Sequence, residues 1–178
     1  EHGQLDQNPK INEFHPAPIL RSARLNVTNE TMQPVTGKVC WALRHADGSV
    51  VRSGEETVTV EALSAHWLDE LVFEEASLND HYLSYAFVVD GQTISEGTAL
   101  FCAPKHFNFA DPQLTVRRDG DQVVVTASAF AKSVCIESED ADLLLSDNFF
   151  DLNACEKRVK ILRGSAENLR VRSVYDLD

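Results

Sequence analysis

Three Asp-Gly pairs, each set between runs of alternating apolar and polar residues, most restrict what this chain can fold into. They occur at Asp47-Gly48, Asp90-Gly91 and Asp119-Gly120. Glycine accepts the positive φ that a tight turn requires, so an Asp-Gly pair between two strand-like runs indicates a β-hairpin. Three such pairs predict that antiparallel sheet is the basis of the fold.

The clearest strand pattern covers Thr36–Ala46. Val39, Trp41 and Leu43 occupy alternate positions there, with Lys38, Cys40 and Arg44 on the other face. This period of two is typical of a strand that buries one face. The same alternation turns Cys40 away from the buried face.

The chain has four cysteines, at Cys40, Cys102, Cys135 and Cys155. No C-x-x-C pair occurs, which argues against a zinc site or a redox motif. Cys40 and Cys102 are separated like the cross-sheet disulfide of a β-sandwich, but Cys40 faces away from the expected core. We therefore expect reduced thiols and a cytoplasmic protein.

The segment Glu61–Leu71 has an ambiguous pattern. Val60, Leu63, Trp67 and Leu71 fall near helical spacing, whereas alternation as a strand is poor. The alternative is an amphipathic helix over Glu61–Leu71. Because strand-like runs surround the segment, we favour a strand over residues 67–73, which leaves room for a single helical turn near Leu63.

Prolines and changes of pattern divide the chain into four parts. Residues 1–18 are polar and proline-containing, which predicts a tail or linker. Residues 19–103 and 113–178 each contain short strand-like runs, whose spacing of about 8–12 residues predicts a β-sandwich. Residues 104–112 begin and end with proline, so we interpret them as a connector.

Composition excludes several classes of function. The 178 residues carry a net charge of −12, which argues against nucleic acid and anionic membrane surfaces as partners. No run approaches the roughly 18 apolar residues of a membrane span, and no signal peptide is recognisable. The chain begins with Glu1 rather than Met, so we expect the native N-terminus to lie upstream.

Residues with catalytic potential form no recognisable motif. The six histidines make no metal-binding pair, and neither a G-x-S-x-G elbow nor a glycine-rich phosphate loop occurs. The adjacent acids Glu55-Glu56 and Glu74-Glu75 would point to opposite faces of a strand. We predict no catalytic residue, no cofactor and no metal.

Acidic residues gather between Glu137 and Asp142. They include Glu139 and Asp140 and could form a weak calcium site or a solvated connection between strands. We favour the connection, because the regular ligand spacing and glycine of a calcium loop are missing.

Aromatic residues could stack on sugars or fill the core. For Trp41, on a regular alternating strand, we predict a core position. For Trp67 and Tyr82 both alternatives stay open, since Asp69 and Asp80 place polar groups beside them.

Residues Leu145–Leu152, with the sequence L-S-D-N-F-F-D-L, carry the most specific signal. This segment resembles the C-terminal end of β-mannosidases of glycoside hydrolase family 2. The earlier run Gly37–Leu43 and the segment Phe101–Lys105 look like the domain that precedes it in that family. Ala154-Cys155 departs from the Pro-Gly usual there, so this turn is expected to differ in type.

The resemblance implies an all-β chain of two tandem immunoglobulin-like β-sandwiches. It also implies a parent β-mannosidase, a retaining enzyme that hydrolyses terminal β-D-mannosides with two glutamates in a TIM barrel. Such a barrel needs about 250 residues, so we expect this chain to be a non-catalytic C-terminal fragment. It would act as a scaffold for the upstream barrel and N-terminal domains.

Two alternatives belong to other classes of function. The first sandwich could be a carbohydrate-binding module for mannan-type β-mannoside glycans, or the chain could be a free-standing immunoglobulin-like interaction protein. A homodimer contact is a further expectation. Neither nucleic acid nor membrane is an expected partner.

Within the motif, Asp147 and Asn148 are expected to accept backbone hydrogen bonds and hold a turn. Phe149 and Phe150 would point to opposite faces, one toward the core and one toward a neighbouring domain. Asp151 would receive a backbone donor. The candidates for a sugar or domain contact are Trp67, Tyr82, Asp147, Asn148 and Phe149.

Overall fold

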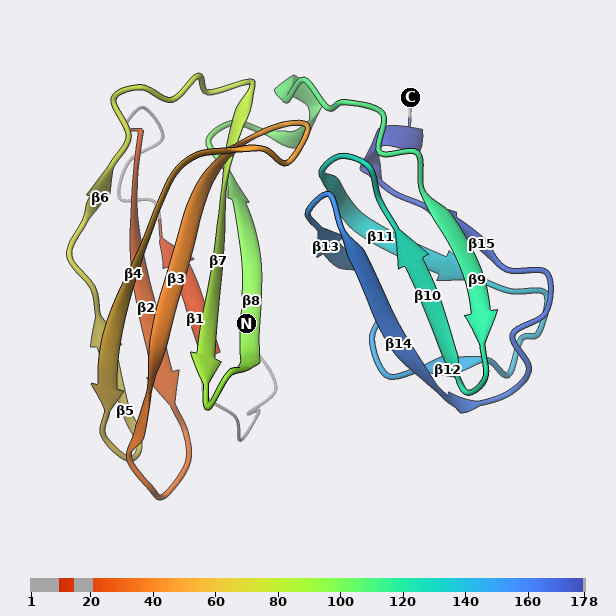
Figure 1. Ribbon diagram of the computed structural model, residues 1–178, viewed down its shortest axis with the longest axis horizontal. Helices are drawn as coiled ribbons and strands as arrows, with labels where there is room; N and C mark the ends of the chain where they lie inside the picture. Colours follow the sequence, from red (N-terminus) through yellow and green to blue (C-terminus); the bar gives the residue numbers. More distant parts are fainter. Residues whose placement is uncertain (1–9, 15–20, 178) are drawn as a thin grey trace. The chain divides into compact units, whose positions relative to one another are not determined.

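The computed structural model describes residues 10–14 and 21–177 and confirms an all-β chain (Figure 1). Its internal contacts divide it into two compact units. The first comprises Glu1–His45 with Val50–Phe107, and the second comprises Ala46–Ser49 with Asn108–Asp178. Each unit is a sandwich of antiparallel sheets.

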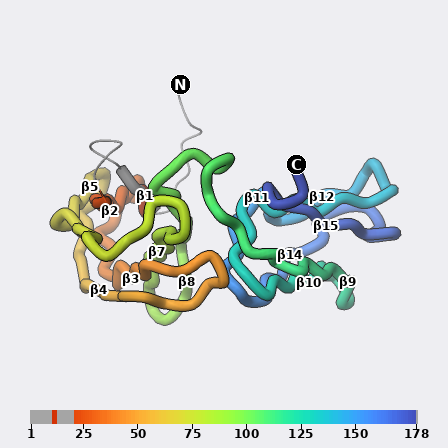
Figure 2. Tube along the Cα trace, turned by 90° about the horizontal axis from the view of Figure 1, so that it is seen from above, coloured from red at the N-terminus to blue at the C-terminus, as the bar shows by residue number. Residues whose placement is uncertain are grey.

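One sheet of the first unit has the strand order β4-β3-β7-β8, and the other has the order β1-β2-β5 with β6 also paired to β2. Figure 2 shows β1, β2 and β5 in one layer and β3, β4 and β8 in the other. The strands are β1 (Lys10–Phe14), β2 (Ser22–Asn29), β3 (Val35–His45), β4 (Val50–Val60), β5 (Ser64–Trp67), β6 (Leu71–Val72), β7 (His81–Val89) and β8 (Gln92–Leu100).

The core of the first unit follows the predicted alternation. Val39 and Leu43 of β3 are completely buried, and Trp41 packs against the same cluster. Burying an aliphatic side chain of this size contributes about 1.5–3 kcal/mol. Trp41 therefore lies on the core face, as predicted, but is only partly buried.

A row of four residues crosses the β4-β3-β7-β8 sheet. Gly54 is opposite Trp41, Trp41 is opposite Tyr85, and Tyr85 is opposite Gly97. A Cβ atom on Gly54 would lie 2.5 Å from Trp41 Cζ2, and one on Gly97 would lie 2.7 Å from the Tyr85 hydroxyl. The two outer glycines thus make room for two large rings on neighbouring strands.

Strand β1 corrects the interpretation of residues 10–14 as part of a tail. It pairs antiparallel with β2, with Ile11 opposite Val27. Ile11 is buried in the core cluster, and its N–H donates to Ser95 Oγ at 3.2 Å. The burial of Ile11 and the backbone pairing with β2 stabilise a strand here, although the local sequence pattern is weak. The rest of the predicted tail, residues 1–9 and 15–18, lies outside the described residues.

The predicted strand over residues 67–73 is interrupted. Strand β5 ends at Trp67, and β6 contains only Leu71 and Val72. Between them Leu68 stays attached to β2, because its N–H donates to Leu25 O at 2.9 Å. Its carbonyl accepts from the Arg24 side chain at 3.1 Å, so a side chain replaces a ladder bond there. Leu63 lies in a turn with φ of 52° rather than in a helix.

The second unit has a sheet of order β12-β14-β10-β9 and a sheet of order β13-β11-β15. Its core contains Val123, Val125 and Val134. The strands are β9 (Thr115–Asp119), β10 (Gln122–Thr126), β11 (Ala131–Glu137), β12 (Leu144–Leu145), β13 (Phe150–Leu152), β14 (Glu156–Arg163) and β15 (Arg170–Arg172). Two single 3₁₀ turns complete the described elements, at Pro104–His106 and Val174–Asp176.

The Asp-Gly pairs make three different turns. Asp90 and Gly91 both have positive φ, 51° and 77°, which is the pattern of a type I′ hairpin between β7 and β8. At the second pair the turn is shifted by one residue: Asp119 ends β9 and Gly120, with φ of 62°, is the first turn residue. A positive φ at that position alone is typical of type II′. Asp47-Gly48 lies in a longer four-residue connection between β3 and β4.

Candidate functional site

The predicted motif lies in the second unit, where β12 ends, the chain turns through Ser146–Phe149, and β13 begins. Ser146 joins the turn to β14, because its N–H donates to Lys160 O at 2.8 Å and its Oγ accepts from Lys160 N at 2.8 Å. The motif is therefore tied at its start to the neighbouring strand.

Asn148 pairs with the backbone of β11 through its side chain. Its Oδ1 accepts from Ile136 N at 2.9 Å, and its Nδ2 donates to Ile136 O at 3.1 Å. A side-chain amide has the same donor and acceptor as a peptide group. Asn148 thus continues the β11–β13 ladder beyond the last backbone pair, Val134 with Phe150.

Asp151 holds an irregularity in β11. The register shifts between Ala131 and Val134, and Ser133 has a positive φ of 53°. Asp151 Oδ1 accepts from the Ser133 N–H at 2.8 Å, and its Oδ2 lies 3.2 Å from Lys132 Nζ. The prediction that Asp151 receives a backbone donor is confirmed.

The two phenylalanines differ strongly in exposure. Phe150 is buried in the core of the second unit, whereas Phe149 is 70% exposed. Phe149 has a φ of 59°, a left-handed conformation that is costly for a bulky residue. The expected division between core and outside is correct, and the contact of Phe149 with a neighbouring domain stays a prediction.

Asp147 does not make the predicted backbone bond. Its Oδ2 lies 2.9 Å from Lys157 Nζ. Lys157 also lies over the Phe150 ring, with Nζ 4.5 Å from the ring centroid. Asp147 therefore positions a lysine over the motif aromatic, while Asn148 makes the backbone contacts.

Trp67 and Tyr82 have opposite environments. Tyr82 is completely buried and meets Phe107 edge-on, with ring centroids 6.3 Å apart. A ring packed in this way cannot stack on a sugar. Trp67 is 45% exposed at the end of β5, and the Arg24 guanidinium lies over its ring at 5.1 Å from the centroid.

Three polar residues share the outer sheet face with Trp67. Asn12 of β1 is opposite Asn26 of β2, and Asn26 is opposite Trp67. Directly opposite residues have side chains on one face, and Arg24, two residues from Asn26, lies on the same face. We call these four residues the Trp67 face. No local pattern signals it, because the register between β1, β2 and β5 brings these residues together.

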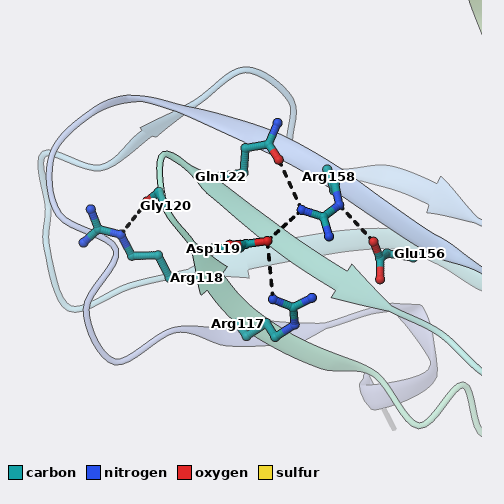
Figure 3. A network of polar contacts seen from close by, with 7 residues as sticks. All are labelled: Arg117, Arg118, Asp119, Gly120, Gln122, Glu156 and Arg158. Carbon is teal, nitrogen blue, oxygen red and sulfur yellow. Dashed lines mark hydrogen bonds and ion pairs between the residues drawn. The ribbon is translucent and has the colours of Figure 1, made fainter.

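A second polar cluster joins three strands of the second unit (Figure 3). Asp119 accepts from Arg158 Nη1 at 2.9 Å and lies 3.7 Å from Arg117 Nη1. Arg158 also donates to Glu156 Oε1 at 3.0 Å. The hydrogen bond and charge of Arg158, with a smaller effect of Arg117, lower the pKa of Asp119.

Arg158 has a structural role in this cluster. It starts on β14 and reaches Asp119 on β9, so its side chain crosses β10. Val124 of β10 is opposite Arg158 and is almost completely buried, although Val123 and Val125 are its neighbours that face the core. Arg117 of β9 is also directly opposite Val124, so both arginines lie on the sheet face of this valine.

The acidic segment from Glu137 to Asp142 binds its own chain. Asp140 accepts from the backbone and side chain of Ser165 and from Asp142 N, and these bonds lower its pKa. Glu137 lies 2.7 Å from Arg172 Nη2. In residues 10–14 and 21–177 no group of three His, Cys, Asp or Glu side chains is arranged to hold a metal. Within the described residues, none of the four cysteines forms a disulfide.

Within the same described ranges, no helix has the length and apolar character needed to cross a membrane. Two family models match the chain. Residues 21–106 match the mannosidase Ig/CBM-like domain, and residues 109–177 match an Ig-fold domain of the mannosidase type. No curated protein matches the sequence.

Solved structures share the fold of both units. A β-D-mannosidase from Dictyoglomus thermophilum matches 94% of this chain with a TM-score of 0.78 and 15% identity. An exo-chitosanase from Amycolatopsis orientalis also matches 94% of it, with a TM-score of 0.62 and 14% identity. The chain spans only 22% and 26% of the lengths of these two proteins.

Proposed function

Because the chain belongs to the mannosidase Ig/CBM-like and mannosidase Ig-fold domain families, we propose that it is a non-catalytic part of a larger glycosidase. The parent would be a β-mannosidase, and the two sandwiches would support its catalytic barrel. The observation that carries this proposal is the match of both sandwiches to one β-mannosidase, of which they span 22%.

Several acidic residues are held by hydrogen bonds and ion pairs within the chain, which supports a non-catalytic role. Retaining glycosidases need two carboxyl groups about 5–5.5 Å apart on either side of the scissile bond. Here Asp119 is paired with two arginines, Asp140 with Ser165, and Asp151 with the Ser133 amide. The lowered pKa of Asp119 and Asp140 keeps both carboxylates ionised, which makes them poor candidates for the general acid that protonates the leaving group.

The supporting contact would include Phe149. Its exposed ring is presented by a turn that Asn148 and Asp151 fix to β11 on either side. Holding a bulky residue at positive φ costs of order 1–3 kcal/mol. A contact with a neighbouring domain would offset that cost by burying the ring.

Two measurements test this function. The purified chain is expected to release no product from an aryl β-mannoside above a blank, with the enzyme from the full reading frame as the positive control. Turnover by the chain alone would overturn the proposal. In the full enzyme, Phe149→Asn is expected to shorten the half-life of activity on heating, whereas Met32→Asn, at an equally exposed position of the first unit, should not. Equal half-lives would contradict a role for Phe149 in support.

A second candidate function is glycan binding at the Trp67 face. A half-exposed indole beside Arg24, with the exposed Asn12 on the same face, offers both ring stacking and hydrogen bonds to sugar hydroxyls. We expect the chain to be retarded in electrophoresis through a gel containing mannan, and Trp67→Ala to abolish that effect. Phe149→Ala removes an exposed ring elsewhere and serves as the control. Unretarded migration of the unmodified chain leaves only the supporting function.

A further inference from the structure

Two histidines face each other at the end of the β3–β7 ladder, where His45 is directly opposite His81. His81 Nε2 lies 2.9 Å from His45 Nδ1, and the ring centroids are 4.6 Å apart. On its other side, His81 Nδ1 lies 2.8 Å from the backbone nitrogen of Ser77. His81 is only 9% exposed, so water has little access to replace either contact.

The Ser77 amide determines where the protons of this pair reside. A backbone N–H can only donate, so His81 Nδ1 must be an unprotonated acceptor. A neutral His81 then carries its hydrogen on Nε2 and donates it to His45 Nδ1, which must also be unprotonated. Every donor meets an acceptor only when both rings are neutral.

A proton added to either ring breaks this arrangement. On His81 it would place an N–H against the Ser77 N–H, and on His45 it would place an N–H against His81 Nε2–H. Two positive rings would also repel each other at this separation. One hydrogen bond is therefore lost whichever ring gains the proton.

The charged side chains near His81 belong to the connection between β6 and β7. Burial, and then the nearby His45, lower the pKa of His81, whereas Asp80 and Glu75 of this connection act in the opposite direction. Cys102, just after β8, is also near Asp80, and burial raises its thiol pKa. The direction for His81 agrees with the hydrogen-bond geometry.

Hydrogen bonds join His81 to the turn that precedes it. The His81 N–H donates to Ser77 O at 3.1 Å, and Ser77 Oγ donates to Asp80 Oδ2 at 2.6 Å. The turn Ser77–His81 is thus closed by one bond from the His81 backbone and one to the His81 ring. Losing the ring bond leaves the partly buried Ser77 amide without this acceptor, which favours opening.

We propose that His45, His81 and the Ser77 amide form an acid-sensitive latch, which keeps the Ser77–His81 turn closed at neutral pH and releases it when His81 gains a proton on Nδ1. The closed turn binds fewer protons than the open one. Opening linked to one proton therefore becomes on the order of tenfold more favourable per pH unit, beginning below the ordinary histidine value of 6.5. The latch does not depend on the glycosidase assignment.

Nuclear magnetic resonance tests the latch on the unmodified chain. At about pH 7.5 the imidazole nitrogens of His81 are expected to show an unprotonated Nδ1 and a protonated Nε2. Between about pH 7.5 and pH 5, hydrogen exchange at the Ser77 amide, corrected for its intrinsic rate, should accelerate at least tenfold relative to amides of the β3–β7 ladder. A proton on His81 Nδ1 at the higher pH, or unchanged relative protection of Ser77, would overturn the proposal.

Variants separate the latch from a general effect of acid. His81→Asn keeps an acceptor for the Ser77 amide but cannot gain a proton, so its Ser77 protection should not depend on pH. His106→Asn, at an exposed position in the same unit, should behave like the unmodified chain. Acid-dependent exchange that persists in His81→Asn would contradict the latch. If that variant does not fold, the tautomer and exchange measurements on the unmodified chain still decide.

Discussion

The β4-β3-β7-β8 sheet of the first sandwich and the short strands of the second are held together by different means. In the first unit β3 and β4 are 11 residues long and pair continuously over most of that length. In the second unit β12 has two residues, and β13 and β15 have three each. Side chains there replace missing ladder bonds, as Asn148 does at Ile136 and Asp151 at Ser133. A small sandwich with short strands thus depends on a few polar side chains.

The largest effect is expected from Asn148→Ala. It removes both partners of the buried Ile136 peptide group and should destabilise the second unit by about 2–4 kcal/mol. Hydrogen exchange of amides in β11 measures this. Both tryptophans belong to the first unit, so the urea midpoint from tryptophan fluorescence should change little. Asn12→Ala is the control. Equal protection of β11 in both variants would show that the second unit does not depend on the Asn148 side chain.

A smaller loss is expected from Gly54→Ala in the first unit. The new Cβ would lie 2.5 Å from Trp41 Cζ2, and overpacking of this kind costs about 1–3 kcal/mol. The urea midpoint from tryptophan fluorescence should fall, and adding Trp41→Leu should recover part of the loss. A Cβ on Gly91 would meet no atom within 4 Å, but the φ there is 77°, so Gly91→Asn tests backbone conformation alone. If the effects of the substitutions at 54 and 41 on the urea midpoint simply add, the packing argument is refuted.

Acid should affect the two units in different pH ranges. The pKa of His81 is lowered in the fold, so its contribution to the first unit is complete above 6.5 and declines as the pH falls below it. The pKa of Asp140 is also lowered, so its contribution to the second unit is complete above 3.8 and declines below that value. Hydrogen exchange followed against pH separates them. Asp140→Asn should remove only the loss of protection that the second unit shows at the lower pH. If both units lose protection at the same pH, the predicted order is wrong.

The smallest effect should be a gain. Phe149→Asn relieves the positive φ of a bulky exposed residue and should stabilise the isolated chain by about 0.5–1 kcal/mol. Exchange of the most protected amides in β10 and β14 measures it, with Met32→Asn as the exposed control. A loss of stability would show that the Phe149 ring packs on its own unit, which would remove the reason to assign it a contact with a neighbouring domain.

Local chemistry in the sequence was enough for the sheets and for the motif. Alternation placed Val39, Trp41 and Leu43 on the core face, and the glycines at 91 and 120 marked two tight hairpins. The motif correctly predicted backbone donors to Asn148 and Asp151 but wrongly predicted one to Asp147. These features depend on neighbouring residues, so a single sequence contains them.

Only the tertiary structure decided which distant residues meet. Strand β1 was missed because its pairing with β2 outweighs a weak local pattern, and Tyr82 proved to be buried against Phe107. The His45–His81 pair and the Arg158 crossing result from strand register. By itself the sequence determined the strand faces, the turns and the family of the motif. Register joins residues tens of positions apart, so the contacts it makes between side chains are set by the whole fold and not by any local segment.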